Sequence, residues 1–298
     1  MAKWQLGDDP KWNDKGRKQS VQKSKAQREG KGTRRTEVRA KKQLGQHFLS
    51  DETAAQTIVD RLEGLGEGSI VEIGPGMGVI THGLLARFGE RLHCLELDRE
   101  SVDYLRGRLP ELSPRLHEAD CLSFDLNALP GGVSGMAGNL PYNISSQILF
   151  QVYDHRQSVQ ECVFMLQREV AERIAATPGG RERGILSVLL QAYYDISFVL
   201  TLPPEAFTPP PKVHSSVIYM RRNTVERLAC DESLFKQVVK ASFSQRRKTL
   251  KNSLYAGLPA VQRKPGFDGL PYLGQRAETL SVEQFVELTN AVKGVIGG

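Results

Sequence analysis

The sequence predicts an α/β protein in which a mostly parallel sheet is wrapped by helices and followed by a smaller helical part. Three observations lead to this prediction. Short β-branched runs alternate with segments of helical spacing from residue 51 to residue 194, which is typical of parallel strands joined by helices. Two later strands flank a proline-rich loop and are expected to close the sheet as a hairpin-like pair. From Thr224 onward the apolar spacing is helical.

The individual elements follow from the period of the apolar residues and from the turn residues between them. The expected strands are 69–73, 91–97, 115–117, 133–138, 162–167, 196–202 and 213–221. The expected helices are 51–63, 79–88, 99–108, 144–153, 168–176 and 185–194, and in the last part 234–242, 248–255 and 282–292. Residues 266–274 are expected to form a loop.

Length and composition fit one α/β domain with a smaller helical domain. The 298 residues allow an α/β domain at 43–223 and a helical domain at 224–298. The four cysteines are far apart and include no C-x-x-C pair, so neither a metal site nor a disulfide framework is indicated. Reduced thiols fit the cytosol, and no apolar stretch approaches the roughly 18 residues of a membrane span. We expect a cytoplasmic protein.

Residues 1–42 form a basic arm. They contain 14 Lys/Arg and 5 Asp/Glu, a net charge of +9, whereas the whole chain carries +6 and residues 43–298 therefore −3. The arm has almost no large apolar residues, so we expect it to be disordered in isolation and to bind phosphates. A solubilising extension is the alternative. Neither a secretory signal nor a transit peptide is indicated, because no apolar stretch follows the charges and acidic residues lie early.

A glycine-rich turn follows the first expected strand of the sheet. Residues 69–73 lead into Gly74-Pro75-Gly76-Met77-Gly78, after which the helical spacing begins. Glycines between a strand and a helix let backbone N–H groups approach a ligand with no Cβ in the way. The G-x-G-x-G spacing differs from the dinucleotide fingerprint G-x-G-x-x-G. The turn alone leaves two interpretations open, a cofactor pocket and an ordinary α/β turn.

Acidic residues follow the next two strands. Glu96 and Asp98 lie about 20 residues past the glycine turn, where a carboxylate commonly accepts hydrogen bonds from ribose hydroxyls. Asp98 is also placed to cap the helix at 99–108, so Glu96 is the preferred ribose ligand. Asp120 is a candidate acceptor for an adenine amino group, with Cys121 and Leu122 packing the ring. A solvated loop aspartate is the alternative for Asp120.

The segment Asn139-Leu140-Pro141-Tyr142 predicts a clamp for a flat ring that carries an amino group. An exocyclic amine is a weak nucleophile because its lone pair is delocalised into the ring. The Asn139 amide oxygen and the Leu140 carbonyl can each accept one of its N–H bonds and favour a pyramidal nitrogen. Pro141 restricts Leu140 to an extended conformation, and Tyr142 offers a face for stacking. A plain turn before the helix at 144–153 is the alternative.

Three further positions have both a functional and a structural interpretation. Phe207 lies in Thr201–Pro211, a stiff loop with five prolines, where it is either an aromatic platform or a plug under the loop. His47, beside Phe48 and Leu49, is without further information a residue that packs at a helix entry. The basic cluster Arg246, Arg247, Lys248 and Lys251 is expected to open or cross a helix, as an RNA contact or as a solvated face.

These segments together resemble the small-subunit ribosomal RNA adenine N6,N6-dimethyltransferases, which use S-adenosylmethionine. The resemblance covers about Lys42 to Val292, and its segments occur in the family's order. They are Leu44–Leu49 (LGQHFL), Val71–Gly78 (VEIGPGMG), Glu96-Leu97-Asp98, Asn139–Tyr142 (NLPY), Phe207–Ser215 (FTPPPKVHS) and Phe243–Leu250 (FSQRRKTL). The last two fit the small-subunit branch better than the related large-subunit enzymes.

The resemblance implies a Rossmann-like methyltransferase sheet and a set of site residues. S-adenosylmethionine would be held by His47, Leu49, Gly74, Gly76, Glu96, Asp120 and Asn139. The target adenine would lie between Tyr142 and Phe207, and Arg246, Arg247, Lys248 and Lys251 would contact RNA. Family members often carry Asn where His47 stands, and both side chains can form hydrogen bonds.

The expected function is therefore dimethylation of adenine N6 at two adjacent adenosines near the 3′ end of small-subunit ribosomal RNA. The resemblance implies a pre-assembled small subunit as the substrate and a role in its biogenesis, and we expect a monomer. Two other classes stay open: an RNA-binding assembly factor without turnover, and a methyltransferase acting on DNA or on a protein glutamine. The intact Asn139–Tyr142 segment argues against the first, and the basic segments argue against the second.

Overall fold

The computed structural model describes residues 38, 40, 41 and 44–297, which belong to one compact unit. Apart from residues 38, 40 and 41, the predicted basic arm at 1–42 lies outside the described residues.

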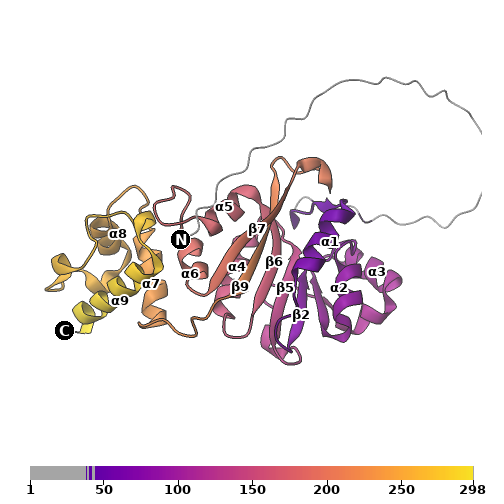
Figure 1. The fold of residues 1–298 in the computed structure, drawn as a ribbon, viewed down its shortest axis with the longest axis horizontal. Helices are drawn as coiled ribbons and strands as arrows, with labels where there is room; N and C mark the ends of the chain where they lie inside the picture. The colour runs from indigo at the N-terminus through magenta and orange to yellow at the C-terminus, as the bar shows by residue number, and fades with distance from the viewer. Residues whose placement is uncertain (1–37, 39, 42–43, 298) are drawn as a thin grey trace, which may run out of the picture. The chain divides into compact units, whose positions relative to one another are not determined.

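A seven-stranded sheet forms the centre of this unit (Figure 1). Its strand order is β4-β3-β2-β5-β6-β9-β7. The first five strands run parallel, whereas β9 runs antiparallel to both β6 and β7. The strands are β2 (Ser69–Ile73), β3 (Leu92–Glu96), β4 (Leu116–Glu118), β5 (Val133–Asn139), β6 (Glu161–Gln167), β7 (Tyr194–Leu202) and β9 (Ser215–Arg222). The predicted parallel α/β sheet with a closing antiparallel pair is confirmed.

The strand order reverses between β2 and β5. From β2 the chain moves outward through β3 and β4 and then returns to the other side of β2 as β5. Glu72 of β2 lies opposite Ala137 of β5, so the carboxyl ends of these two parallel strands lie side by side. Ligands of open α/β sheets collect at such a reversal, because the connections leave in opposite directions and open a crevice.

A second, two-stranded sheet joins distant parts of the chain. β1 (Phe48–Leu49) runs antiparallel to β8 (Phe207–Thr208), with Leu49 opposite Phe207. Ser50 extends this connection, since its backbone N–H and its hydroxyl both donate to the Ala206 carbonyl oxygen, at 2.9 Å each. The segment before the first helix is thereby attached to the proline-rich loop.

Nine α-helices lie within the described residues. They are α1 (Glu52–Arg61), α2 (Thr81–Phe88), α3 (Arg99–Arg108), α4 (Ser145–Asp154), α5 (Arg168–Ala175), α6 (Ile185–Gln191), α7 (Glu232–Ser242), α8 (Leu250–Gly257) and α9 (Val282–Gly297). The first begins after Asp51, whose carboxylate accepts a hydrogen bond from the Ala54 N–H at 3.0 Å. Such a cap satisfies a backbone donor that the helix cannot pair.

Helices cover both faces of the sheet because successive strand residues point to opposite sides. Ile70 of β2 packs in one buried cluster with α1, α2 and α3, represented by Ile58 and Leu84. The next residue, Val71, packs in the other cluster with Ile148 of α4. Fully burying each such side chain stabilises the fold by roughly 1.5–3 kcal/mol.

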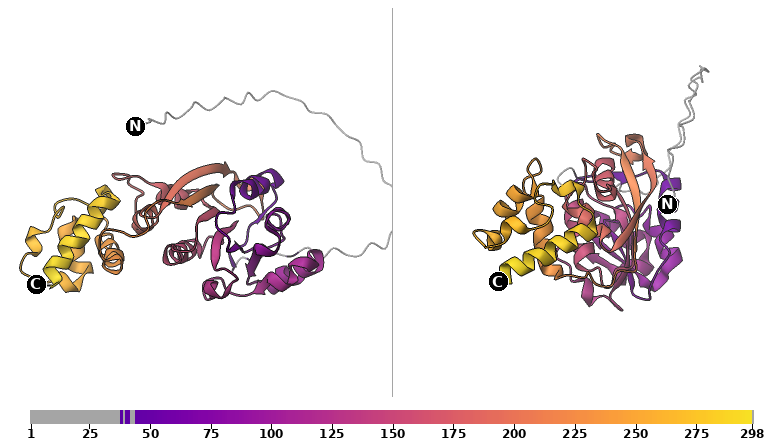
Figure 2. Two further views of the ribbon diagram at one scale, coloured as in Figure 1. Left: turned by 60° about the horizontal axis from the view of Figure 1, so that its bottom comes forward. Right: turned by 60° about the vertical axis from the view of Figure 1, so that its left-hand side comes forward.

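The second of these clusters continues into the last part of the chain. The side chains of Leu189 in α6, Val238 in α7, Leu254 in α8 and Leu288 in α9 are all fully buried in it. α7, α8 and α9 gather in one group, drawn in orange to yellow, and Figure 2 shows this group from two further sides. The expected helical region after Thr224 is therefore present.

Most expected elements differ from the structure by one or two residues at their ends. Two helices differ more: α9 continues to Gly297, beyond the expected end at 292, and the helix expected at 185–194 is shorter, because α6 ends at Gln191 and Tyr194 already opens β7. Tyr194 lies opposite Arg222 in the ladder with β9, so sheet pairing ends the helix early. The loop expected at 266–274 contains one short 3₁₀ turn at Phe267–Gly269.

Candidate functional site

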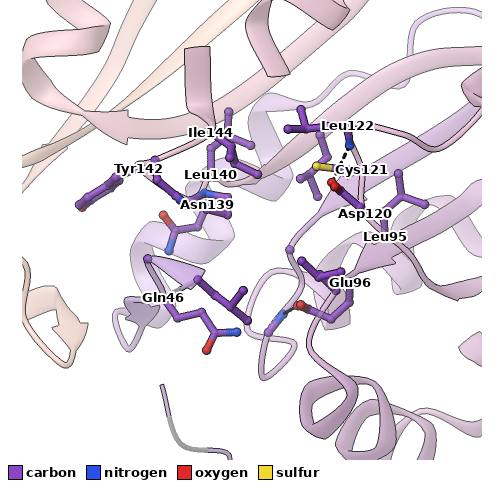
Figure 3. A pocket seen from close by; sticks show the side chains of 18 of the residues that line it. Gln46, Leu95, Glu96, Asp120, Cys121, Leu122, Asn139, Leu140, Tyr142 and Ile144 are labelled. Atoms are coloured by element: carbon purple, nitrogen blue, oxygen red, sulfur yellow. Dashed lines mark hydrogen bonds between the residues drawn. The ribbon is translucent and has the colours of Figure 1, made fainter. Parts of the chain in front are cut away.

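A cavity opens at the carboxyl ends of β2, β3, β4 and β5, with an empty volume of about 900 Å³ that includes the part open to solvent. Figure 3 shows Asn139 and Tyr142 on one side of it and Glu96 and Asp120 on another. Its lining comes from the segment before α1 and from all four strand ends. The lining residues are 44–48, 73, 74, 76, 95–97, 119–122 and 139–144.

The glycine turn gives the cavity a wall of bare backbone. Gly74, Gly76 and Gly78 have φ values of +65°, +57° and +84°, a conformation that residues with a Cβ rarely adopt. A Cβ added at Gly74 would meet no atom within 4 Å, so the backbone there faces open space. The turn can therefore approach a ligand closely, as the sequence predicts.

Glu96 and Asp98 have the different roles that the sequence favours. The Glu96 carboxylate lines the cavity and accepts the N–H groups of Gly76, at 3.0 Å, and of Asp98, at 2.8 Å. Burial raises its pKa above the ordinary value. The Asp98 carboxylate caps α3 by accepting from the Glu100 N–H at 3.2 Å. Of these two carboxylates, Glu96 is the one that lines the cavity.

Asp120, Cys121 and Leu122 line the side of the cavity that β4 reaches. The Asp120 carboxylate accepts from the Leu122 N–H at 2.9 Å, which closes a tight turn and leaves the side chain exposed. Cys121 is buried, and burial raises the pKa of its thiol to about 12, so it is a neutral apolar surface. Leu97, which lines the cavity and is 55% exposed, adds a second apolar surface. This region can hold a flat apolar ring with one polar edge.

Asn139, Leu140, Pro141 and Tyr142 line the cavity together, as predicted. The Asn139 Nδ2 donates to the backbone oxygen of His47 at 2.7 Å, which fixes the orientation of the amide and leaves its Oδ1 as an acceptor. The Tyr142 hydroxyl shares a hydrogen bond of 2.6 Å with the Ser215 Oγ. Both functional side chains of this segment are therefore held in place by other elements.

His47 and Leu49 line different pockets. His47 lines the main cavity, where its ring stacks on Tyr142 with centroids 5.4 Å apart. Leu49 is buried and instead lines a smaller pocket that it shares with Glu72, Gly74 and Asn139. Only the first of these two residues lies at the main cavity.

Phe207 does not lie where an aromatic platform is expected. Its side chain is 2% exposed and packs in the core cluster of α1, α2 and α3. It does not line the main cavity, so the structure does not bring it together with Tyr142. The pairing of β8 with β1 explains this, because it turns the ring inward beside Leu49. The alternative that the sequence left open, an aromatic plug under the proline loop, describes this position.

Three of the four residues of the basic cluster lie in the turn between α7 and α8 and not on a helix. α7 ends at Ser242 and α8 begins at Leu250, so of the four residues only Lys251 is helical. Arg246 donates to the carbonyl oxygens of Arg181, at 2.8 Å, and Arg183, at 3.3 Å, which bends the chain toward the α5–α6 loop. Lys251 forms an exposed ion pair with Asp268 at 2.8 Å. Arg247 and Lys248 are exposed.

Two groups near the cavity were not singled out from the sequence. Lys41 binds the Asp98 carboxylate at 2.5 Å, and Gln46 donates to the same carboxylate at 3.3 Å. These bonds attach the segment before α1 to the end of β3, and they outweigh the effect of burial, so the pKa of Asp98 is lowered. Lys41 and Gln46 lie 57 and 52 residues before Asp98, so no periodic pattern in the sequence indicates these contacts.

Glu72, in the middle of β2, is the second group. It is 1% exposed, and burial raises the pKa of its carboxyl to about 7. The Cys94 thiol lies within hydrogen-bonding distance of it, at 3.5 Å. In the sequence, Glu72 could have been found as an acidic residue inside an otherwise apolar strand.

Two kinds of feature are absent from the part of the chain that the structure describes. No group of three or more His, Cys, Asp or Glu side chains is arranged to hold a metal ion there. No helix in that part combines the length and the apolar character needed to cross a membrane.

Comparison with known proteins places this geometry in context. The family model described as "Ribosomal RNA adenine dimethylase" matches residues 37–293. A protein of Parabacteroides distasonis named "Ribosomal RNA small subunit methyltransferase A" is 51% identical over 252 residues, 85% of this chain and 93% of that protein. One of Porphyromonas gingivalis with the same name is 50% identical over 256 residues, 85% of this chain and 97% of its own length.

Solved structures show the same fold. A dimethyladenosine transferase from Plasmodium falciparum matches with a TM-score of 0.69 and 22% identity, over 81% of this chain and 96% of that one. The 23S rRNA methyltransferase ErmE matches with a TM-score of 0.61 and 23% identity, over 83% of this chain and 99% of its own. The predicted Rossmann-like methyltransferase sheet is confirmed.

Proposed function

The chain belongs to the ribosomal RNA adenine dimethylase family, and we propose that the cavity between β2 and β5 is its active site. The enzyme is an adenine N6,N6-dimethyltransferase of small-subunit ribosomal RNA. Its substrates are two adjacent adenosines near the 3′ end of that RNA. The observation that carries the assignment of the site is that Gly74 and Asn139, at the ends of neighbouring strands, line one cavity.

The residues around the cavity suit S-adenosylmethionine. The open backbone at Gly74 can accommodate the methionine part, while Gly76 donates its N–H to Glu96, whose carboxylate can also accept hydrogen bonds from ribose hydroxyls. Leu97 and Leu122 can enclose the adenine ring, with Asp120 beside its amino group. When bound, this cofactor supplies an electrophilic methyl group on a sulfonium.

The clamp prepares the target nitrogen for attack. The Oδ1 of Asn139 and the Leu140 carbonyl accept the two N–H bonds of the adenine amine, which localises the lone pair on nitrogen. These two acceptors would hold the nitrogen toward the part of the cavity beside Gly74, where the cofactor would present its methyl group. The proton leaves the nitrogen after transfer, when the alkylated amine is far more acidic, so a strong base is not needed. Positioning of this kind can supply several kcal/mol of the barrier reduction, about 7–11 kcal/mol at most.

We assign recognition of the ribosomal RNA to residues 224–298 and catalysis to residues 43–223. Arg247 and Lys248 are exposed in the turn between α7 and α8, where phosphates can reach them. Arg246 supports that turn through its bonds to the α5–α6 loop. We further propose that the substrate is a partly assembled small subunit, which links methylation to subunit biogenesis. We also propose that the enzyme acts as a monomer.

Transfer of a labelled methyl group tests the function. The purified protein and labelled S-adenosylmethionine are combined with immature small subunits, naked ribosomal RNA, duplex DNA or total protein, and the modified positions are mapped. Dimethyladenosine at two adjacent positions of the small-subunit RNA is the expected product. Label in DNA or protein would favour another acceptor, and tight binding to the subunit without label would favour an assembly factor.

A further inference from the structure

The ring of His47 occupies a face of Tyr142. The two rings are stacked, with centroids 5.4 Å apart and an interplanar angle of 30°. The His47 Nδ1 lies 2.8 Å from the backbone oxygen of Pro209, and since a carbonyl only accepts, this nitrogen carries the proton and donates. The imidazole is therefore held between the proline-rich loop and the clamp.

Tyr142 itself has little freedom to move. Its hydroxyl is bound to the Ser215 Oγ at the start of β9, and its backbone follows the restricted Pro141. His47 belongs to the short segment before α1, which is attached at separate points through Gln46 and Ser50. Of the two stacked rings, the imidazole is the one that can leave by a side-chain rotation.

The backbone and the side chain of His47 have separate partners. Its carbonyl oxygen accepts from Asn139, so His47 and the catalytic amide lie on the same side of the cavity. Its side chain bonds to the proline-rich loop and stacks on Tyr142. Rotation of the His47 side chain therefore exposes the face of Tyr142. The hydrogen bond from Asn139 to the His47 carbonyl oxygen is kept, so the orientation of the Asn139 amide does not change.

We propose that the His47 side chain holds the place of the target adenine on Tyr142 and is displaced when the base enters. This inference rests on the proposed role of Asn139–Tyr142 as the adenine clamp. A base must exchange with the imidazole, and a purine, with two fused rings, stacks over a larger area than an imidazole or a pyrimidine does. His47 is then a residue that determines base specificity, because it rejects bases that stack too weakly to replace it.

The test follows the His47 ring directly. The histidines are isotopically labelled, the cofactor site is filled with S-adenosylhomocysteine, and nuclear magnetic resonance records the ring protons, with the His47 signal identified from its loss in His47→Asn. Adenosine is the probe and cytidine its comparison. The expected result is a His47 signal shifted by the Tyr142 ring current in the free enzyme, which moves to an unstacked position with adenosine and does not with cytidine.

Binding measurements supply a second readout. His47→Asn removes the competing ring, and an aromatic pair of about 0.5–1.5 kcal/mol predicts adenosine binding about two- to tenfold tighter than in the wild type. His47→Phe keeps a ring on Tyr142, so adenosine binding should stay weak. His82→Asn, at an exposed position of α2, is the matched control and should match the wild type.

Two results would overturn the inference. One is a His47 signal that stays stacked while adenosine saturates the enzyme, and the other is adenosine binding that His47→Asn weakens or leaves undetectable. Both are distinct from failure of the proposed function, which would appear as a wild-type protein that transfers no methyl group to ribosomal RNA. Melting temperatures of the variants identify any loss of folding.

Discussion

Gly138 lies against the backbone of Ile73: a Cβ added to Gly138 would come within 2.4 Å of the Ile73 carbonyl oxygen. Its φ of +152° also suits glycine alone. This close approach of β5 to β2 is what places Asn139 beside Gly74. A Cβ added to Gly135, the other glycine of β5, would instead meet the flexible Cδ1 end of the Ile70 side chain.

Gly138→Ala should therefore reduce both stability and turnover. The forced separation of the strands is expected to lower the free energy of unfolding by about 1–3 kcal/mol, and it moves Asn139 away from the methyl donor. Urea denaturation and methyl transfer to immature subunits measure the two effects. The control is Gly135→Ala, in which the Ile70 side chain can adjust, and equal activities of the two variants would contradict this account.

Asn139→Ala should separate catalysis from cofactor binding. Without the Oδ1 acceptor the adenine amine loses its alignment, and by analogy with other positioned hydrogen-bonding groups we expect turnover to fall at least about 100-fold. Glycine backbone and Glu96 still hold the cofactor, so its Kd should change only a few-fold. Gln147→Ala, an exposed position of α4, is the control. Intact turnover in Asn139→Ala would refute the amine clamp.

Phe207→Leu and Tyr142→Leu should have different effects. Phe207 is buried, so its truncation should lower the free energy of unfolding by about 1 kcal/mol or more and have less effect on the KM for RNA. Tyr142 offers a stacking face, so its loss should raise that KM about tenfold or more. Thermal unfolding and steady-state kinetics distinguish the two. An equally large rise of KM in Phe207→Leu would mean that its ring leaves the core during catalysis.

Glu72 should make the protein less stable as the pH rises. Burial raises the pKa of this carboxyl to about 7, from an ordinary 4.5, so the folded state holds a proton that the unfolded state has released. Its contribution is complete below about pH 4.5 and is lost as the pH passes 7, a change of about 3 kcal/mol. Glu72→Gln lacks this proton equilibrium.

The pH dependence is measured as a difference between the two proteins. Free energies of unfolding of wild type and Glu72→Gln are compared from pH 5 to pH 8.5. The variant should gain on the wild type from pH 5 to about pH 7, and the difference should level off above the folded-state pKa. A constant difference across this range would show that Glu72 titrates normally.

Arg247→Ala and Lys248→Ala should each weaken RNA binding and reduce the salt slope of log Kd by about one. Both side chains are exposed in the α7–α8 turn. Lys251→Ala should have a smaller effect, because that ammonium is already paired with Asp268. Titrations of small-subunit RNA at several salt concentrations measure the slopes. Unchanged slopes in the first two variants would place the RNA contacts elsewhere.

Local patterns predicted the sheet correctly, and most of the residues assigned to the site line one cavity. The boundaries 69–73 and 99–108 agree with β2 and α3, since a β-branched run before glycine and an aspartate cap are local signals. Glu96, Asp120 and Asn139 end successive strands, and parallel strands place such ends on one edge of the sheet. This geometry follows from the order of elements alone.

The errors arise where distant segments meet. Phe207 is buried because β8 pairs with β1, about 160 residues earlier, and no period in Thr201–Pro211 contains that information. The residues around Arg246 can form a helix, yet bonds to the carbonyls of Arg181 and Arg183 accompany a turn. The bond between Lys41 and Asp98 is likewise a tertiary contact.

The buried cluster that joins α4 and α6 to α7, α8 and α9 has a consequence for how the enzyme melts. Because one continuous set of apolar side chains supports both regions, neither can lose its packing without exposing the other's. We therefore expect the two regions to which we assign catalysis and RNA recognition to unfold in a single cooperative transition. A fragment that ends at residue 223 would expose to water the apolar side chains that pack against α7, α8 and α9. We therefore expect this fragment to self-associate.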